Sequence, residues 1–296
     1  MTKTAMITIC GRPNVGKSTL TNALVGEKIA IVSPKPQTTR SRITAIVSHG
    51  DTQFVLLDTP GFHKPRTRLG DYMVNVVRES VADVDCVLLL VEPIPSVGPQ
   101  EEALIDRLRQ AKVPALLVIN KIDTVDKAGL LAVMAVYAAA FDFDAILPVS
   151  AKTGEGLDEL LAEMEKYAAE GPHLFPDDMI TDQPERQICA ELVREKLLRC
   201  LDKEIPHGTA VEVTKFSERD NGIIDLEVTI FCDKESHKGI IIGKKGAMLK
   251  KIGELARHDI EDFMGTKVNL QTWVKVKENW RDSMASLRNF GFTDQN

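Results

Sequence analysis

The sequence predicts two domains: a larger α/β domain with a doubly wound, mostly parallel sheet, and a smaller α+β domain after it. Residues 5 to 170 alternate short apolar runs with helix-like segments, whereas residues 185 to 296 contain strands in which apolar and polar residues alternate. Strands of a parallel sheet are buried on both faces and are therefore apolar throughout, whereas strands with one face in water alternate. A length of 296 residues also suits two domains.

The first domain contains five segments that we expect to be strands. Helix-like segments lie between them, among them PQEEALIDRLRQA (99–111) and DKAGLLAVMAVYAAAF (126–141). Strand–helix repetition of this kind predicts helices on both faces of a parallel sheet. The expected strands are AMITIC (5–10), FVLLD (54–58), CVLLLVE (86–92), PALLVIN (114–120) and AILPVS (145–150).

A linker separates the two domains. GPHLFPDDMITDQP (171–184) holds three prolines and three acids, a composition typical of a connecting segment. We therefore place the first domain at 1–172, the linker at 173–184 and the second domain at 185–296. The second domain is expected to run helix, strand, strand, helix, helix, strand, with strands in TAVEVTKF (209–216), IIDLEVTIFC (223–232) and KVNLQTWVKVK (267–277).

Composition narrows the class of protein. The apolar fraction of 44% and charged fraction of 27% are ordinary for a soluble chain. Five cysteines without a CxxC pair argue against a disulfide framework and a zinc site, and favour a reducing cytoplasm. The longest apolar runs are too short to span a bilayer, and the N-terminus does not read as a signal peptide.

The sequence GRPNVGKS matches a phosphate-binding loop. It follows an expected strand and opens a helix, which is the context that makes such a match credible. Backbone N–H groups and the helix N-terminus would surround the phosphates, Lys17 would reach the β- and γ-phosphates, and Ser18 would bind Mg²⁺. The predicted loop residues are Gly11, Arg12, Pro13, Asn14, Val15, Gly16, Lys17, Ser18 and Thr19.

Three further motifs end expected strands: DTPG (58–61), NKID (120–123) and SAK (150–152). Ligands of open α/β sheets bind at the carboxyl ends of the strands, so all three are expected at one site. With the loop, and in this order, the set resembles the P-loop GTPase family. The nucleotide site then also includes Asp58, Thr59, Pro60, Gly61, Asn120, Lys121, Asp123, Ser150, Ala151 and Lys152.

The resemblance implies guanine as the base. Asp123 would accept hydrogen bonds from the ring, Lys121 would lie along it, Asn120 would tie the loops together, and the Ala151 N–H would meet guanine O6. Adenine offers Asp123 neither an N1 proton nor a 2-amino group, so the carboxylate would stay unpaired at a cost of about 1 kcal/mol or more.

The resemblance also implies Mg²⁺ and a switch segment. Ser18 would bind the ion directly and Asp58 through water, and a threonine of PKPQTTRSRIT (34–44) would join them when a γ-phosphate is present. Thr38 and Thr39 both remain candidates, as metal ligands and in catalysis. The residues expected to act in hydrolysis are Lys17, Thr38, Thr39, Gly61 and Asn14.

Phe62 follows DTPG directly, where many GTPases have a glutamine that orients the attacking water. Because phenylalanine can neither donate nor accept a hydrogen bond, we expect slow intrinsic hydrolysis. Asn14 resembles the asparagine with which some GTPases hold K⁺ beside the phosphates. A turn-forming asparagine is the alternative, so K⁺ as a second cofactor stays open.

A second glycine-rich turn, Gly-Lys-Lys-Gly at 243–246, lies between two expected helices. Six lysines and one acid occupy residues 234 to 251 of a chain whose net charge is −6. The turn and the element order resemble a type-II KH domain, whose GxxG loop clamps single-stranded nucleic acid. Trp273 and Trp280 in TWVKVKENW could form a stacking surface, but we expect core and helix-packing roles for both. The predicted RNA-binding residues are Ile242, Gly243, Lys244, Lys245, Gly246 and Lys250.

A GTPase domain followed by one type-II KH domain resembles the Era family over nearly the whole chain, as do HLFPDDMITDQPER and WVKVKENW. The resemblance implies a cytoplasmic GTP/GDP switch. Its RNA partner would be the single-stranded 3′ end of 16S rRNA, and it would assist 30S ribosomal subunit assembly. Nothing in the sequence demands more than a monomer.

Three other functions are compatible with parts of the sequence. A metabolic phosphotransferase would need an acceptor pocket and lid residues, and NKID with SAK argues against it. A membrane-associated GTPase could use the lysines on anionic lipid; no amphipathic anchor accompanies them, so peripheral membrane contact would be secondary. A general mRNA regulator differs only in the identity of its RNA.

Overall fold

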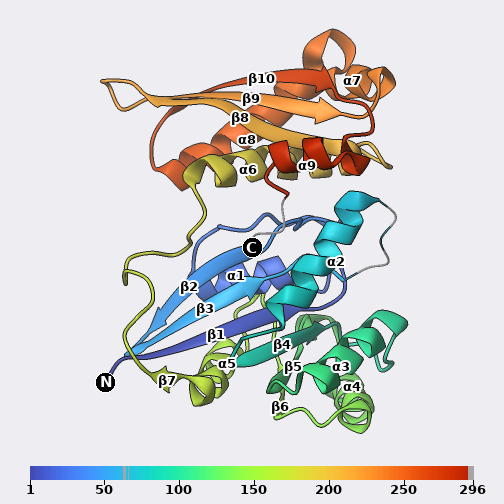
Figure 1. The fold of residues 1–296 in the computed structure, drawn as a ribbon, viewed down its shortest axis with the longest axis vertical. Coiled ribbons are helices and arrows are strands. Elements are labelled where there is room, and N and C mark those ends of the chain that lie inside the picture. The colour runs from blue at the N-terminus through green and yellow to red at the C-terminus, as the bar shows by residue number, and fades with distance from the viewer. Residues whose placement is uncertain (63–64, 66, 293–296) are drawn as a thin grey trace. The chain divides into compact units, whose positions relative to one another are not determined.

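The computed structural model describes residues 1–62, 65 and 67–292. The described chain divides into two compact units (Figure 1). The first comprises Met1–Ala30, Thr39–Lys64 and Met73–Asp182, and the second Ile31–Thr38, Pro65–Tyr72 and Gln183–Asn296. The second unit thus includes two short segments that the expected division at 173–184 assigns to the first domain.

The first unit is built on a sheet with the strand order β2-β3-β1-β4-β5-β6, and β7 pairs with β1. The pairs β1–β3, β1–β4, β4–β5 and β5–β6 are parallel, whereas β2–β3 and β1–β7 are antiparallel. The strands are β1 (Lys3–Cys10), β2 (Ile43–His49), β3 (Thr52–Asp58), β4 (Cys86–Val91), β5 (Ala115–Ile119), β6 (Ala145–Pro148) and β7 (Ala169–Glu170).

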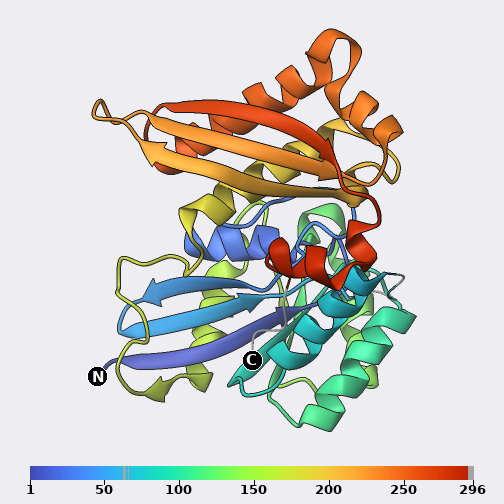
Figure 2. The same cartoon turned by 45° about the horizontal axis from the view of Figure 1, so that its top comes forward.

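Helices cover both faces of this sheet (Figures 1 and 2). Successive side chains of β4 are therefore buried on opposite faces of the sheet. Leu88 and Leu90 pack in a core with α1 and α5, whereas Val87 and Leu89 pack in a second core with α2, α3 and α4. The doubly wound fold is confirmed, and burial on both faces explains why the strands are apolar throughout. The helices are α1 (Lys17–Val25), α2 (Arg68–Ser80), α3 (Pro99–Ala111), α4 (Lys127–Ala140) and α5 (Leu157–Met164).

The second unit has a three-stranded sheet of order β10-β9-β8, in which β8–β9 is antiparallel and β9–β10 is parallel. The expected order of helix, strand, strand, helix, helix, strand is confirmed. The elements are α6 (Glu185–Cys200), β8 (Thr209–Glu218), β9 (Ile224–Cys232), α7 (Glu235–Ile242), α8 (Ala247–Met264), β10 (Val268–Val276) and the closing helix α9 (Met284–Asn289).

The core of the second unit forms between one face of the sheet and helices α6 and α8. Ile252, Ala256 and Ile260 recur every fourth residue along α8 and are fully buried, as the period of a helix on a core requires. Trp280 is also buried, and its indole N–H donates to the Gly208 carbonyl over 2.9 Å. Trp273 on β10 is 43% exposed, so the core position expected for it is wrong.

Across the described residues, no helix combines the length and the apolarity that crossing a membrane would require.

Candidate nucleotide and RNA sites

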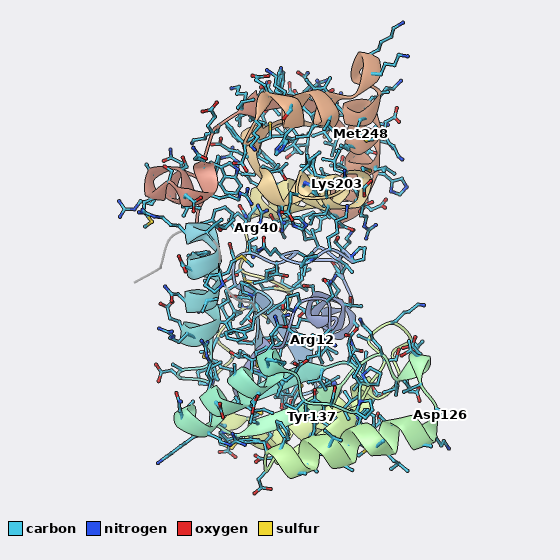
Figure 3. The ribbon with its side chains drawn as sticks, turned by 90° about the vertical axis from the view of Figure 1, so that its right-hand side faces the viewer. Arg12, Arg40, Asp126, Tyr137, Lys203 and Met248 are labelled. Carbon is cyan, nitrogen blue, oxygen red and sulfur yellow. The ribbon has the colours of Figure 1, made fainter. Side chains whose placement is uncertain are left out.

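The GRPNVGKS loop connects β1 to α1 at the carboxyl edge of the sheet. Gly16 has a φ of 103°, and a Cβ built there would lie 2.2 Å from Nδ2 of Asn120. Only glycine lets the loop approach the NKID motif this closely. Arg12 belongs to the same loop (Figure 3).

Lys17 is buried at the start of α1, and its Nζ donates to the carbonyls of Gly11 and Arg12, each over 3.1 Å. Burial lowers the pKa of this ammonium, and the nearby Asp58 carboxylate opposes the shift. A buried cation held by two loop carbonyls is suited to exchange them for phosphate oxygens.

Ser18, Thr39 and Asp58 converge beside Lys17. Ser18 Oγ lies 2.9 Å from Thr39 Oγ1 and donates to Asp58 Oδ2 over 2.9 Å. Burial raises the pKa of Asp58 to about 6, against the influence of Lys17. The other Asp58 oxygen is buried without a hydrogen-bond partner among the described residues. Hydroxyl and carboxylate oxygens suit Mg²⁺, and the unpartnered oxygen fits a metal-bound water.

Thr38 does not reach this cluster. Its hydroxyl donates to the Lys35 carbonyl over 2.7 Å, and Thr38 belongs to the second compact unit, whereas Thr39 belongs to the first. Of the two threonines that the sequence left open, the structure therefore brings only Thr39 to Ser18 and Asp58.

The loops expected to read the base are tied together. Asn120 Nδ2 donates to the Val15 carbonyl over 2.9 Å, and the Ala151 N–H donates to Asn120 Oδ1 over 3.0 Å. Ser150 Oγ donates to Asp123 over 2.7 Å, which fixes the carboxylate. The NKID and SAK motifs and the phosphate loop thus meet at one edge of the sheet.

Sequence reasoning missed Glu92, which follows β4 at the same edge. Its carboxylate forms ion pairs with Lys121 and with Arg12, and Arg12 also pairs with Glu101 over 2.8 Å. The Lys121 ammonium donates to the Asn14 carbonyl over 2.8 Å as well. The sequence did indicate that Glu92 lies at this edge, because Glu92 ends the expected strand CVLLLVE just as Asp58 ends FVLLD.

The other residues predicted for the site lie on its flanks. Thr59 is buried, and its hydroxyl donates to the Ile9 carbonyl over 2.8 Å. Phe62 donates its backbone N–H to the Gly11 carbonyl over 3.1 Å, and its ring lies 4.5 Å from the Arg107 guanidinium. Asn14 and Lys152 are exposed.

Residues Ile31–Thr38 are held by α6 within the second unit. Arg194, 1% exposed, donates to the carbonyls of Thr38 and Gln37. Arg199 donates to the Val32 carbonyl over 3.0 Å, and Lys35 donates to the Leu201 carbonyl. These contacts could not be predicted, because α6 by itself reads as an ordinary amphipathic helix.

The second glycine-rich turn joins α7 to α8. Gly243 has a φ of 72°, and a Cβ there would lie 2.7 Å from Met248 Cβ, so a larger residue would push the turn away from α8, where Met248 lies (Figure 3). Lys244, Lys245 and Lys250 are exposed around it, Ile242 and Gly246 partly so. An open backbone flanked by cations is suited to a nucleic-acid strand.

Comparison with known proteins gives consistent results. Residues 6–121 match a family described as 50S ribosome-binding GTPase, and residues 204–281 match the KH domain family. The chain is 51% identical to GTPase Era of Ruminiclostridium cellulolyticum, covering 98% of this chain and 97% of that protein. It is 50% identical to GTPase Era of Clostridioides difficile, covering 100% of both.

Two solved structures are similar over the full length. One is a variant of Aquifex aeolicus Era bound to GDP and AlF₄⁻, with a TM-score of 0.95 at 37% identity. The other is Era in complex with MgGDPNP and nucleotides 1506–1542 of 16S ribosomal RNA, with a TM-score of 0.94 at 37% identity. In each case 99% of this chain and 100% of the solved chain are covered.

Proposed function

This chain belongs to the Era family of GTPases, and from that premise we propose that it is a GTP-driven switch that binds 16S rRNA near its 3′ end and assists 30S subunit assembly. It hydrolyses GTP to GDP and phosphate. The main support for 16S rRNA as the partner is the similarity, over 99% of the chain, to an Era structure that contains both MgGDPNP and 16S rRNA nucleotides.

At the phosphates, Lys17 would exchange its loop carbonyls for β- and γ-phosphate oxygens. Ser18, Thr39 and Asp58 would hold Mg²⁺, which neutralises phosphate charge when bound. The backbone N–H of Gly61 would meet the γ-phosphate. The contacts of the Ser18 hydroxyl with Thr39 and Asp58, which bring three oxygens together, support these roles.

At the base, Asp123 would accept from guanine while Ser150 fixes its carboxylate, and Lys121 would lie along the ring while Glu92 holds its ammonium. Ala151 would donate its N–H to guanine O6. The remaining residues predicted for the nucleotide site would shape the loops around the ligand: Arg12, Pro13, Val15, Gly16, Thr19, Thr59, Pro60 and Lys152.

The contacts of α6 with Ile31–Thr38 could couple the state of the bound nucleotide to RNA binding. Thr39 would move with Mg²⁺ and the γ-phosphate, and the carbonyl of the preceding residue, Thr38, is held by Arg194. A change at Thr39 would therefore reach α6 through one peptide bond. We retain 1–172, 173–184 and 185–296 as functional divisions, with Ile31–Thr38 connecting the first to the last.

K⁺ is a further proposed cofactor, because Phe62 leaves no polar side chain where a glutamine would stand. Asn14 lies in the phosphate loop itself, where it is exposed and has a φ of 67°. Hydrolysis should be faster in KCl than in NaCl of equal concentration. Equal rates in the two salts would remove this role.

The experiment for the whole proposal compares RNA affinity in two nucleotide states. Fluorescence anisotropy would follow a labelled single strand matching the 3′ end of 16S rRNA, with protein in GDPNP or in GDP, at fixed salt because phosphate contacts are salt-dependent. Tighter binding in GDPNP is expected. Equal affinity in both states would contradict the switch.

A matched pair of variants locates the RNA on the second unit. Lys244→Gln together with Lys245→Gln should weaken binding about tenfold or more, because two cations are lost from the GKKG turn. Lys267→Gln removes an exposed lysine of the same unit that pairs with Glu261 and should change the RNA affinity little.

We propose that the protein is a cytoplasmic monomer. Liposome flotation in competition with RNA would reveal any peripheral membrane contact.

A further inference from the structure

A cavity lies in the first unit between α2 and α3, which run side by side in Figure 2. Its volume is about 640 Å³, within the range of about 300 to 1,000 Å³ for small-molecule sites. None of its lining residues belongs to the phosphate loop or to the DTPG, NKID or SAK motifs. It is therefore not part of the nucleotide site.

Two arginines line this cavity, Arg78 from α2 and Arg107 from α3. Neither forms an ion pair within 4 Å with any residue that the structure describes. The one acid in the lining, Asp106, already pairs with Arg109 over 2.6 Å. The fold thus brings two guanidinium groups to one cavity whose single carboxylate is paired with a third arginine.

The surroundings of Arg107 disfavour its positive charge. Burial lowers the pKa of Arg107, and the charge of Arg78 lowers it further. One of its terminal nitrogens, Nη1, is buried and has no hydrogen-bond partner in the described part of the chain. Its guanidinium carbon lies 4.5 Å above the Phe62 ring, an attractive cation–π contact that supplies no hydrogen-bond acceptor.

The rest of the lining indicates what kind of compound would fit. Val81, Ala103 and Ala111 contribute apolar wall, and Gln110 a polar amide. Arginine binds carboxylate and phosphate groups with paired N–H donors. Small-molecule sites typically combine apolar walls with a few polar groups that orient the ligand.

We propose that the α2–α3 cavity binds a small-molecule oxyanion, a compound with an apolar body and a carboxylate or phosphate group held by Arg78 and Arg107. This site is separate from the nucleotide and RNA sites. It would be occupied while GDP or GTP is bound, and it does not depend on the proposed RNA function.

The test uses the full chain saturated with Mg²⁺ and GDP, so that the phosphate loop is filled. Benzoate and phenyl phosphate present one aromatic body with the two candidate groups, and benzamide is the neutral control. NMR titration would follow the arginine Nε–H signals. We expect saturable chemical-shift changes with benzoate, phenyl phosphate or both, and none with benzamide. Whichever anion binds more tightly shows whether the site prefers a carboxylate or a phosphate.

Matched variants identify the arginines. Arg107→Gln and Arg78→Gln should each weaken probe binding about tenfold or more, because each removes a charged hydrogen-bond donor. Lys127→Gln removes an exposed cation at the start of α4, outside the lining of the cavity, and should bind like the parent chain. Arg78 is exposed, so its variant keeps the test valid even if Arg107→Gln folds poorly.

Two results would overturn the proposal. One is the absence of saturable binding of either anion by the parent chain. The other is binding that Arg78→Gln leaves unchanged. Loss of RNA binding in either variant would bear on the proposed function and not on this site.

Discussion

Two adjacent threonines show the limit to which the role of a single residue can be predicted from the sequence. Thr38 and Thr39 have the same side chain in one loop, so no pattern in the sequence separates them. The structure separates them by contacts, because Thr39 meets Ser18 whereas Thr38 meets the Lys35 carbonyl. Lys17, Ser18 and Asp58 could be predicted because their motifs specify both residue type and place in the fold.

The two threonines should respond differently to substitution. Thr39→Ala removes an oxygen from the Mg²⁺ cluster and should lower the rate of GTP hydrolysis by about 10- to 100-fold, whereas Thr38→Ala should stay within about threefold. Single-turnover hydrolysis at saturating Mg²⁺ would measure both. A larger loss in Thr38→Ala than in Thr39→Ala would reverse the assignment.

At the scale of elements, prediction succeeded where one face or both faces of an element are buried. The strands β1, β3, β4, β5 and β6 were expected from their apolar runs, and each lies in the sheet. The antiparallel strand β2 was missed, because its first residues fall in the segment taken for the switch loop. The role of α6 could not be predicted, since it depends on Ile31–Thr38, far away in the sequence.

Helix α6 should transmit the nucleotide state. Arg194→Gln removes the donors that hold the Gln37 and Thr38 carbonyls, so the ratio of RNA affinities in GDPNP and GDP should fall toward one. Intrinsic hydrolysis should change less, because Arg194 does not touch the Mg²⁺ cluster. Arg186→Gln, exposed on the same helix, is the control. A ratio unchanged by Arg194→Gln would exclude this route.

Helix α8 should contribute to stability through its buried face. Ile252→Ala leaves a cavity in the core of the second unit and should lower the free energy of unfolding by about 2–5 kcal/mol. Leu255→Ala, 43% exposed on the same helix, should cost less than about 1 kcal/mol. Both tryptophans, Trp273 and Trp280, lie in this unit, so fluorescence during urea unfolding reports it selectively. Equal effects of the two substitutions would contradict the assigned core.

At the scale of the whole molecule, the sequence predicted the two folds and their order, because each carries its own motif and periodicity. It did not predict that the chain between α1 and β2 is shared between the compact units. Domain division from sequence relies on contiguous composition, and Ile31–Thr38 differs from its neighbours by tertiary contacts alone. The α2–α3 cavity was also missed, since Arg78 and Arg107 belong to no motif and meet only after folding.

The cysteines allow a prediction for the whole chain. Burial raises the pKa of Cys10, Cys86 and Cys189 to about 12 and also raises that of Cys232. Only Cys200 is not fully buried. Because the thiolate is the reactive form, a disulfide reagent should label one thiol rapidly in the native chain and all five after unfolding. Cys200→Ser should abolish the rapid phase.

The same shifts give the chain a pH dependence. The native state keeps the protons on the buried thiols of Cys10, Cys86 and Cys189, whereas an unfolded chain loses them near its ordinary pKa of about 8.5. The unfolded state thus binds fewer protons above that pH, so their contribution to stability falls as pH rises from about 9 toward 12. Because the native chain keeps these thiols buried and protonated at pH 9, raising the pH from 7 to 9 should leave the count of rapidly labelled thiols at one. A second rapid thiol at pH 9 would mean that one of the buried cysteines is accessible in the native chain, and that the core around it opens without unfolding.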